Sequence, residues 1–385
     1  MLPIADLEVA TGRLRLTDSD GRVVEEELRP FAAEVTISRI RIDFDAQLLS
    51  LALPDETSIT VALHLGAARQ EAYLSDRTIV YLDQNHWSKL AAARCGGQGV
   101  STEDAAAAEV LAGLADQRHI VLPLSAGHAV ETGALYGLRR TQIASAMLGL
   151  SQGWLMRHPS WIRSEEFATA REGLAGATQR VFVQDADQLF TRPLRNPSVA
   201  GLPAPMAALG KPIINVLSIA TTLTHPEKMS DVDGRAAAAA WAQSRQDAAD
   251  CVRADHISAE RARQVANAQT LWDSNAELLM AWPDSDPDAR GEWLKRTYDD
   301  VGQMPCLSRV RAIFYARLRN GSRWYANDFT DIMYLSCAAG YADLVVGERR
   351  TIGELRTARN ITHGARLASH LPDAIAALEE MGCSV

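Results

Sequence analysis

The sequence predicts an α/β protein with a parallel sheet, preceded by a small β-rich module and interrupted by a large helical insertion. Three observations support this prediction. Apolar and polar residues alternate, as in β-strands, over 1–75. Short apolar runs then alternate with helical segments over 76–150 and again over 319–385, which is typical of a layered fold with a parallel sheet. Between them, 151–318 has mostly helical spacing.

The N-terminal module, 1–75, contains several short strand patterns. The segment "GRLRLTDSDGRVVEEELRP" alternates on both sides of "DSDG", which is typical of a β-hairpin. The segments "EVTISRIRIDF" and "SITVALHL" continue the period of two. These patterns predict a small β-sheet, and nothing in them indicates a chemical function.

The first part of the predicted core, 76–150, has the order strand, helix, helix, strand, helix. The apolar run 78–82 predicts a strand that leads directly into Asp83 and a helix. "TEDAAAAEVLAGLADQ" is rich in Ala and acidic near its start, so it predicts a stable helix. "RHIVLPLS" predicts a second strand, and the residues up to 150 return to helical spacing.

The rest of the chain divides into the predicted insertion, 151–318, and the second part of the core, 319–385. Within the insertion, 234–282 is compatible with one long helix or with a helical hairpin. The proline-rich run 193–212 predicts a loop or a lid. In the second part of the core, "NDFTDIMYLSCAAGYA" predicts a helix, and "DLVVGERR" predicts a strand that ends in a charged turn.

Acidic residues stand where the predicted strands end or where helices begin. The five candidates are Asp83, Glu131, Asp328, Asp331 and Glu348. Because the carboxyl ends of parallel strands line one edge of a sheet, acids from distant positions can meet there. Clustered carboxylates raise one another's pKa unless a cation neutralises them. Hard divalent metals prefer oxygen ligands, and paired metal ions of this kind catalyse phosphodiester hydrolysis.

Two segments resemble the opening and closing segments of the PIN-domain (PIN-like) metal-dependent ribonucleases. "VYLDQNHWSKL" has an apolar strand, an Asp, one further residue, an Asn and then a helix. In "NDFTDIMYLSCAAGYADLVVGERR", an Asp opens an Ala-rich helix before a strand that ends in an acid. The resemblance covers 76–150 and 319–355. It implies an α/β/α sandwich and a ribonuclease that depends on Mg²⁺ or Mn²⁺.

The resemblance also implies roles for single acids. Asp83, Glu131, Asp328 and Asp331 would be catalytic residues that bind the metal. Glu348 would be a further catalytic acid, although the family often has Asp at this place. Since 197 positions separate Glu131 from Asp328, the helical middle would be an insertion beside or over the site.

Each acid also has a purely structural explanation. Asp83 and Asn85 are at positions where they could cap the following helix. Asp328 and Asp331 could be acids that complement the dipole of a helix start. Glu131 alone could be a solvated helix residue. The order of the acids along the chain is what favours the metal site.

Substrate contacts are predicted at Asn85, His86, Arg323, Arg349 and Arg350. From the resemblance, Asn85 is expected to cap the helix after the first strand and to hold the turn at the strand end. The arginines are expected to bind phosphate groups.

The segment "ARLRNGSRWYAND" is the most basic local patch near the late acids. It contains Arg317, Arg319 and Arg323. The aromatic residues that follow, Trp324 and Tyr325, could stack on unpaired bases. Packing in the core is the open alternative for both.

Composition limits the possible partners and the compartment. A net charge of −9 and a pI of about 5.5 argue against non-specific binding of duplex nucleic acid through overall charge. The five cysteines are scattered and include no CxxC, so we expect a reducing cytoplasm and neither a disulfide framework nor a zinc ribbon. We also expect no signal peptide and no membrane span.

Together these features predict a cytoplasmic endoribonuclease that hydrolyses phosphodiester bonds of single-stranded or structured RNA, with DNA as the less favoured substrate. Family analogy adds the expectation of a bacterial toxin or defence effector. A homo-oligomer or a regulatory protein partner is left open. One alternative is a catalytically inactive PIN-like binding or assembly protein. Another is a DNase or phosphohydrolase that uses the same acidic site.

Overall fold

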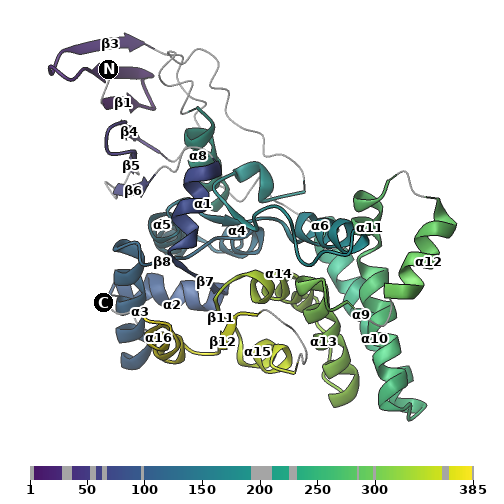
Figure 1. Cartoon of the computed structure of the whole chain (residues 1–385). Helices are drawn as coiled ribbons and strands as arrows, with labels where there is room; N and C mark the ends of the chain where they lie inside the picture. The colour runs from purple at the N-terminus through teal and green to yellow at the C-terminus, as the bar shows by residue number, and fades with distance from the viewer. Residues whose placement is uncertain are drawn as a thin grey trace.

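The computed structural model describes residues 4–27, 37–52, 58–62, 67–96, 99–191, 210–224, 232–283, 286–297, 301–357 and 364–383. Figure 1 shows a small β-sheet at one end, a mixed α/β part in the middle and a group of helices at the other end. Among the described residues, no helix combines the length and the apolar character needed to cross a membrane.

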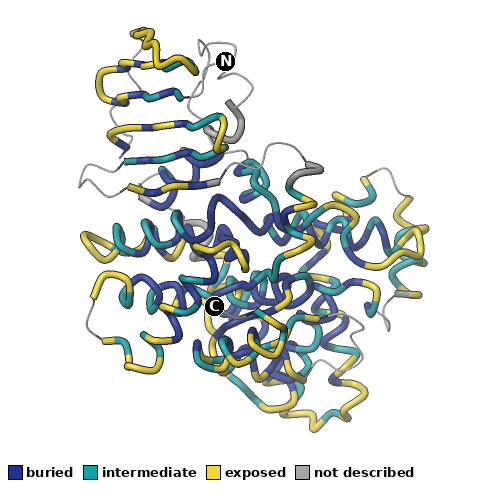
Figure 2. The backbone as a smooth tube through the Cα atoms, turned by 60° about the vertical axis from the view of Figure 1, so that its left-hand side comes forward, coloured by how far each residue is buried: buried dark blue, intermediate teal, exposed yellow. Residues whose placement is uncertain are grey.

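The N-terminal module is an antiparallel sheet of six strands. Its strands are β1 (Ile4–Glu8), β2 (Arg13–Thr17), β3 (Val23–Glu27), β4 (Arg39–Asp43), β5 (Leu48–Ala52) and β6 (Ser58–Ala62). Their order in the sheet is β3-β2-β1-β4-β5-β6. Buried and exposed residues alternate along β2 and β4, so one face is apolar and the other carries charged pairs such as Arg15 with Glu25. Figure 2 shows this alternation along the strands.

The predicted β-rich module is therefore confirmed, with one correction at its end. The residues after the sheet form the helix α1 (Ala67–Ser75) rather than a further strand. The sheet meets the rest of the molecule through β6, which packs against helix α5 (Gly137–Ser151) (Figure 1).

The central sheet is parallel, as the sequence predicts, and it has four strands. They are β7 (Thr78–Leu82), β8 (Ile120–Val121), β11 (Leu344–Val346) and β12 (Arg366–Ala368), in the order β12-β11-β7-β8. From β7 the chain continues to β8 on one side and returns much later to β11 on the other side. The strand order therefore reverses between β7 and β11. At such a switch point a crevice opens outside the carboxyl ends of the strands.

Helices cover both faces of this sheet. Val80 and Leu82 of β7 belong to one apolar core, together with residues of α2 (Gln84–Arg94), α3 (Thr102–Asp116) and α16 (Leu371–Glu380). Tyr81, between them in sequence, belongs to another core with residues of α14 (Asn327–Tyr341) and α15 (Arg349–Leu355). Because neighbouring residues of a strand point to opposite faces, a strand covered on both sides is apolar throughout.

The strand and helix order predicted for 76–150 is confirmed as far as β8, whereas the one helix expected after it is divided into α4 (Ala126–Gly133) and α5. The region 151–318 differs in one respect from the helical prediction. It begins with two short antiparallel strands, β9 (Leu155–Met156) and β10 (Phe182–Val183), and Leu124 forms a parallel bridge with Leu155. Strands of two residues are too short to show a period in the sequence.

The other elements described in this region are helices. It contains α6 (Pro159–Arg171), the 3₁₀ turn η1 (Ala186–Gln188), α8 (Gly210–Thr224), α9 (Val232–Ala254), α10 (Ala259–Asp273), α11 (Asn275–Ala281), α12 (Pro287–Thr297) and α13 (Pro305–Asn320). The segment 234–282 is a hairpin of α9 and α10, with Ser258 capping α10, followed by α11. In the proline-rich run, 193–209 lies outside the described residues.

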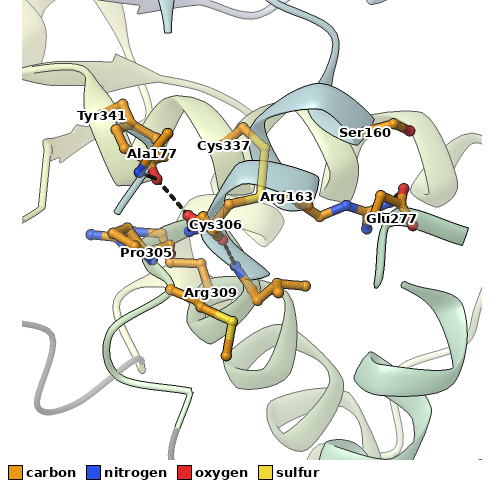
Figure 3. The surroundings of a disulfide bond; sticks show 12 residues. Ser160, Arg163, Ala177, Glu277, Pro305, Cys306, Arg309, Cys337 and Tyr341 are labelled. Atoms are coloured by element: carbon orange, nitrogen blue, oxygen red, sulfur yellow. Dashed lines mark hydrogen bonds and ion pairs between the residues drawn. A yellow bond between two sulfur atoms is a disulfide. The ribbon is translucent and has the colours of Figure 1, made fainter. Parts of the chain in front are cut away.

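A disulfide between Cys306 and Cys337 joins α13 to α14 (Figure 3). The scattered cysteines indicate no disulfide framework, and this single pair was not predicted. The two Cα atoms lie 4.5 Å apart, a spacing that suits a disulfide, although the residues are 31 positions apart in sequence. Beside the disulfide, the buried Glu166 of α6 accepts hydrogen bonds from the backbone N–H of Cys306 (2.6 Å) and from Tyr341 (2.6 Å). This contact fixes α6, α13 and α14 to one another.

Candidate functional site

Asp83 stands at the carboxyl end of β7, and each of its side-chain oxygens has a different environment. Its backbone N–H donates to Val346 O (2.9 Å), which ties the end of β7 to β11. Its Oδ1 accepts from the backbone N–H of His86 (3.1 Å) and lies 2.5 Å from His86 Nδ1, so Asp83 is the N-cap of α2. Its Oδ2 is buried and has no hydrogen-bond partner among the described residues. The cap therefore uses one oxygen and leaves the other available.

Asn85 connects the ends of the two central strands. The prediction that Asn85 caps the helix is wrong: Asp83 is the N-cap, because α2 begins at Gln84 and Asn85 is already in its first turn. The Asn85 side chain instead donates to Glu348 Oε1 (2.8 Å). Glu348 is exposed and precedes α15 without capping it. This hydrogen bond holds Glu348 near the end of β7.

Glu131 is positioned by the local structure of α4. Ser125 caps this helix, and His128 completes a capping box by accepting from the Ser125 backbone N–H (3.0 Å). The other ring nitrogen of His128 lies 2.7 Å from Leu82 O, so α4 is tied to β7. Burial lowers the pKa of His128 to about 4, which keeps the ring neutral. His128 is thus a structural histidine that orients the helix bearing Glu131.

A glycine lets α14 approach α4 closely. A Cβ atom added at Gly127 would lie 3.0 Å from the ring of Tyr334, so a larger residue would force that ring to shift. Tyr334 lies three residues after Asp331 and therefore on the same side of α14. The close approach brings Asp331 to the side of the sheet edge where Glu131 lies.

Asp83, Glu131 and Asp331 line the same small pocket. They come from the end of β7, from α4 and from α14, which are distant in sequence and adjacent in space (Figure 1). Tyr81 and Tyr334 form part of the wall. The structure therefore brings together three of the five predicted acids at the carboxyl edge of the sheet.

Two acids of this pocket, Glu131 and Asp331, hold their protons more tightly than isolated carboxyl groups do. Burial, followed by the charge of Glu348, raises the pKa of Asp331 to about 7. Glu131 is exposed as a whole residue, but its carboxyl group is buried. This burial, followed by the charges of Asp331 and Asp83, raises the pKa of Glu131 to about 8. Among the described residues that line the pocket there is no lysine or arginine. The carboxylates therefore crowd together without a protein cation between them.

Asp328 lies one turn before Asp331, but its carboxylate is engaged elsewhere. Its Oδ2 lies 2.5 Å from Arg317 Nη1 and accepts from the Tyr325 backbone N–H (2.7 Å). Arg350 adds a longer contact of 3.6 Å to Oδ1. Arg317 is itself fully buried and bonded to Glu354 (2.9 Å). The spacing predicts both acids at one site, whereas the structure places Asp328 in an ion-pair network beside the pocket.

The other predicted contacts divide into buried and exposed residues. His86 is buried against Asp83 rather than presented to a substrate. Arg317 is buried as well, and Trp324 packs in the core against Arg317 and Trp241. Among the residues predicted to contact RNA or to form the basic and aromatic patch, the exposed or partly exposed ones include Arg319, Arg323, Tyr325, Arg349 and Arg350.

Sequence reasoning did not identify the two tyrosines of the pocket wall. Tyr81 lies inside an apolar strand and Tyr334 inside an apolar helix, so both have the pattern of core residues. The spacing of Tyr334 from Asp331 is the one signal that places it on the same helix face.

The described residues contain no group of three or more His, Cys, Asp or Glu side chains that is already arranged to hold a metal ion. The donor chemistry of the pocket nevertheless suits a hard divalent cation. Asp83 has a buried oxygen without a partner, and the pKa values of Glu131 and Asp331 are raised. Magnesium usually keeps several waters and uses only one or two carboxylates. The residues therefore fit a partly hydrated magnesium or manganese ion.

No protein-family model matches the chain, and comparisons with curated proteins and with solved structures find no similar protein. Its function is therefore inferred from the chemistry of the pocket and from its place in the fold.

Proposed function

We propose that the chain is a PIN-like endoribonuclease that depends on magnesium or manganese. The observation that carries the proposal is the convergence of Asp83, Glu131 and Asp331 in one pocket. The pocket lies at the carboxyl edge of the sheet, where the strand order reverses, and open α/β sheets bind their ligands at that place. The resemblance of the segments around Asp83 and Asp331 to PIN-domain nucleases supports the same assignment.

In this proposal Asp83, Glu131 and Asp331 hold the cation, and Glu348 adds negative charge nearby. A bound divalent cation would supply positive charge to the phosphodiester and make the attacking water more acidic. His86 and the α2 backbone hold Asp83 Oδ1, which leaves Oδ2 for the cation. At neutral pH, without metal, the Glu131 carboxyl keeps its proton because its pKa is about 8. To hold a cation, the Glu131 carboxyl would have to be ionised.

Positive side chains beside the pocket would offset the charge of the RNA backbone. Arg349 is exposed and directly follows Glu348, and Arg323 is exposed on the loop before α14. Guanidinium groups bind phosphate oxygens through two parallel hydrogen bonds. These two residues are therefore suited to orient a phosphodiester toward the acids.

The first test measures loss of a fluorescently labelled full-length RNA with Mg²⁺, with Mn²⁺ and with a chelator. We expect cleavage that requires a divalent ion. Asp83→Asn, Glu131→Gln and Asp331→Asn should each reduce the rate by roughly 100-fold or more, because each removes a charged ligand. Asp116→Asn is the matched control, since Asp116 is an exposed acid of α3 away from the pocket.

Other outcomes point to the alternatives. RNA that is bound but never cut by the wild-type chain, over several substrates and both metals, would favour a catalytically inactive binding or assembly protein. Faster loss of DNA, or of a small phosphoester, than of RNA would favour a DNase or phosphohydrolase with the same acids.

A further inference from the structure

An exposed tyrosine lies close to the pocket without belonging to it. Tyr325 is 52% exposed and lies six residues before Asp331. Its backbone N–H donates to Asp328, which is one turn before Asp331 on α14. The helical part of this interval, from Asn327 to Asp331, spans roughly 6 Å, and Tyr325 precedes it by two residues. The ring is therefore within reach of a short single strand whose phosphate occupies the pocket.

Two arginines hold positive charge against this ring. The Cζ atoms of Arg323 and Arg350 lie 5.8 and 5.7 Å from the ring centroid of Tyr325. Arg350 is fixed in this place, because it donates to Arg323 O (2.6 Å) and lies 3.6 Å from the carboxylates of Asp328 and Glu354. The network that takes Asp328 away from the pocket thus positions a guanidinium beside an exposed aromatic ring.

The neighbouring tryptophan shows why this tyrosine is presented to solvent. Trp324 is only 4% exposed and packs between Arg317 and Trp241, with a distance of 4.7 Å from Arg317 Cζ to its ring centroid. It anchors the loop to the core. Tyr325, the next residue, is left at the surface. Phe329, one turn further on, is 37% exposed and extends the aromatic surface.

An acidic protein needs such a local positive surface to bind RNA. The net charge is −9, and the pocket gathers carboxylates without a lysine or arginine among its described lining residues. Arg319, Arg323 and Arg349 are exposed, and none of them forms an ion pair with another described residue. Their charges are therefore available to phosphates.

We propose that Tyr325, together with Arg323 and Arg350, forms a platform on which an unpaired base of single-stranded RNA stacks. This inference rests on the proposed function and narrows its substrate to RNA with unpaired bases. Aromatic rings and guanidinium planes stack on bases of any sequence, whereas the bases of a duplex are already stacked on one another. The platform would hold the base next to the phosphate that enters the pocket.

The test measures binding separately from cleavage. A chelator removes divalent ions, and fluorescence anisotropy reports binding of a short unstructured RNA, of its duplex and of single-stranded DNA of the same sequence. We expect the single strand to bind more tightly than the duplex. Tyr325→Ala and Tyr325→Leu should raise Kd for the single strand roughly 5- to 100-fold, and Tyr325→Trp should preserve it. Trp272→Ala, which removes a 78% exposed aromatic ring of α10, should leave Kd unchanged.

The outcomes separate this inference from the nuclease proposal. An unchanged Kd in both Tyr325→Ala and Tyr325→Leu, or duplex binding as tight as that of the single strand, would overturn the platform. Tyr325-dependent binding without any metal-dependent cleavage would support the platform and contradict the nuclease. Metal-dependent cleavage with RNA binding that does not depend on Tyr325 would support the nuclease and contradict the platform. Equal binding of single-stranded DNA supports stacking and shows that the sugar is not recognised there.

Discussion

Asp83 can cap a helix and bind a metal ion at the same time, because its carboxylate has two oxygens in different environments. The structural interpretation holds for Oδ1, which caps α2 and contacts His86. The ligand interpretation concerns Oδ2, which is buried without a partner among the described residues. His86 is 3% exposed, so its ring cannot turn away from Asp83 without disturbing the core. A residue that caps a helix with one oxygen can therefore present the other in a fixed direction.

This arrangement predicts that His86 positions the carboxylate rather than touching the substrate. We expect His86→Ala to weaken Mn²⁺ binding by about 10- to 100-fold, the usual effect of losing the partner of a metal ligand. Calorimetric titration with Mn²⁺ measures the affinity directly and does not depend on turnover. His119→Ala, at an exposed histidine before β8, is the control. An unchanged affinity in His86→Ala would refute the positioning role.

A second residue-scale prediction concerns Glu166, which is fully buried beside the disulfide. Burial raises its pKa from 4.5 to about 7, although hydrogen bonds from Cys306 N–H and Tyr341 oppose the rise. Between these values the native state holds more protons than the unfolded state. The free energy of unfolding therefore falls as pH rises through this window, by about 3 kcal/mol from this group.

Urea unfolding at about pH 5 and about pH 8 measures this loss. Other buried acids contribute in the same direction, so the informative quantity is the difference between wild type and Glu166→Gln. We expect the variant to lose less stability between the two pH values, because glutamine does not titrate. Equal losses in the two proteins would show that Glu166 is not the source.

At the scale of elements, both ends of α14 are fastened, and Asp331 lies between the two points. Near its start, Asp328 pairs with Arg317 of α13. Near its end, Cys337 is bonded to Cys306, also of α13. Figure 3 shows the second point, with Arg309 and Tyr341 beside it. Two attachments to one neighbouring helix fix the rotation of α14 and hence the direction of Asp331.

The disulfide should contribute measurably to the stability of this helix pair. It closes a loop with a sequence separation of 31, for which chain entropy gives about 3–4 kcal/mol. We expect Cys306→Ala with Cys337→Ala to lower the free energy of urea unfolding by about this amount in oxidising buffer. A reductant should lower the stability of wild type but not of the variant. Cys251→Ala, at an exposed free cysteine, is the control.

Wild type and the double variant with equal stability in oxidising buffer would contradict this contribution. A drop that persists when both proteins are fully reduced would assign the loss to packing of the buried side chains instead.

At the scale of the whole molecule, local patterns predict a parallel sheet and a β-rich module, but not the short edge strand β12 (Arg366–Ala368). Both depend on the period and apolar character of strands, as in 78–82, which the sequence displays directly. The strand-end position of Asp83 is readable from the sequence. Asp331 lies inside α14, so its convergence on the same pocket also depends on how α14 packs.

The features that the sequence could not reveal depend on contacts between distant elements. Cys306 meets Cys337 only because α13 packs on α14. Arg317 takes Asp328 out of the pocket for the same reason, and spacing within α14 gives no sign of it. The strands β9 and β10 have two residues each and depend on their pairing with each other and with Leu124.

The charge of the whole molecule leads to the last prediction. With a net charge of −9, RNA binding must depend on a few local arginines rather than on overall attraction. If Arg319, Arg323 and Arg349 supply three phosphate contacts, log K should fall against log salt with a slope of about −2 in metal-free buffer. Arg323→Ala and Arg349→Ala should each make the slope shallower by about 0.7.

Anisotropy titrations over a series of KCl concentrations measure this slope, with Arg94→Ala of α2 as the control. A much steeper wild-type slope, or one that neither substitution changes, would place the RNA on a different surface.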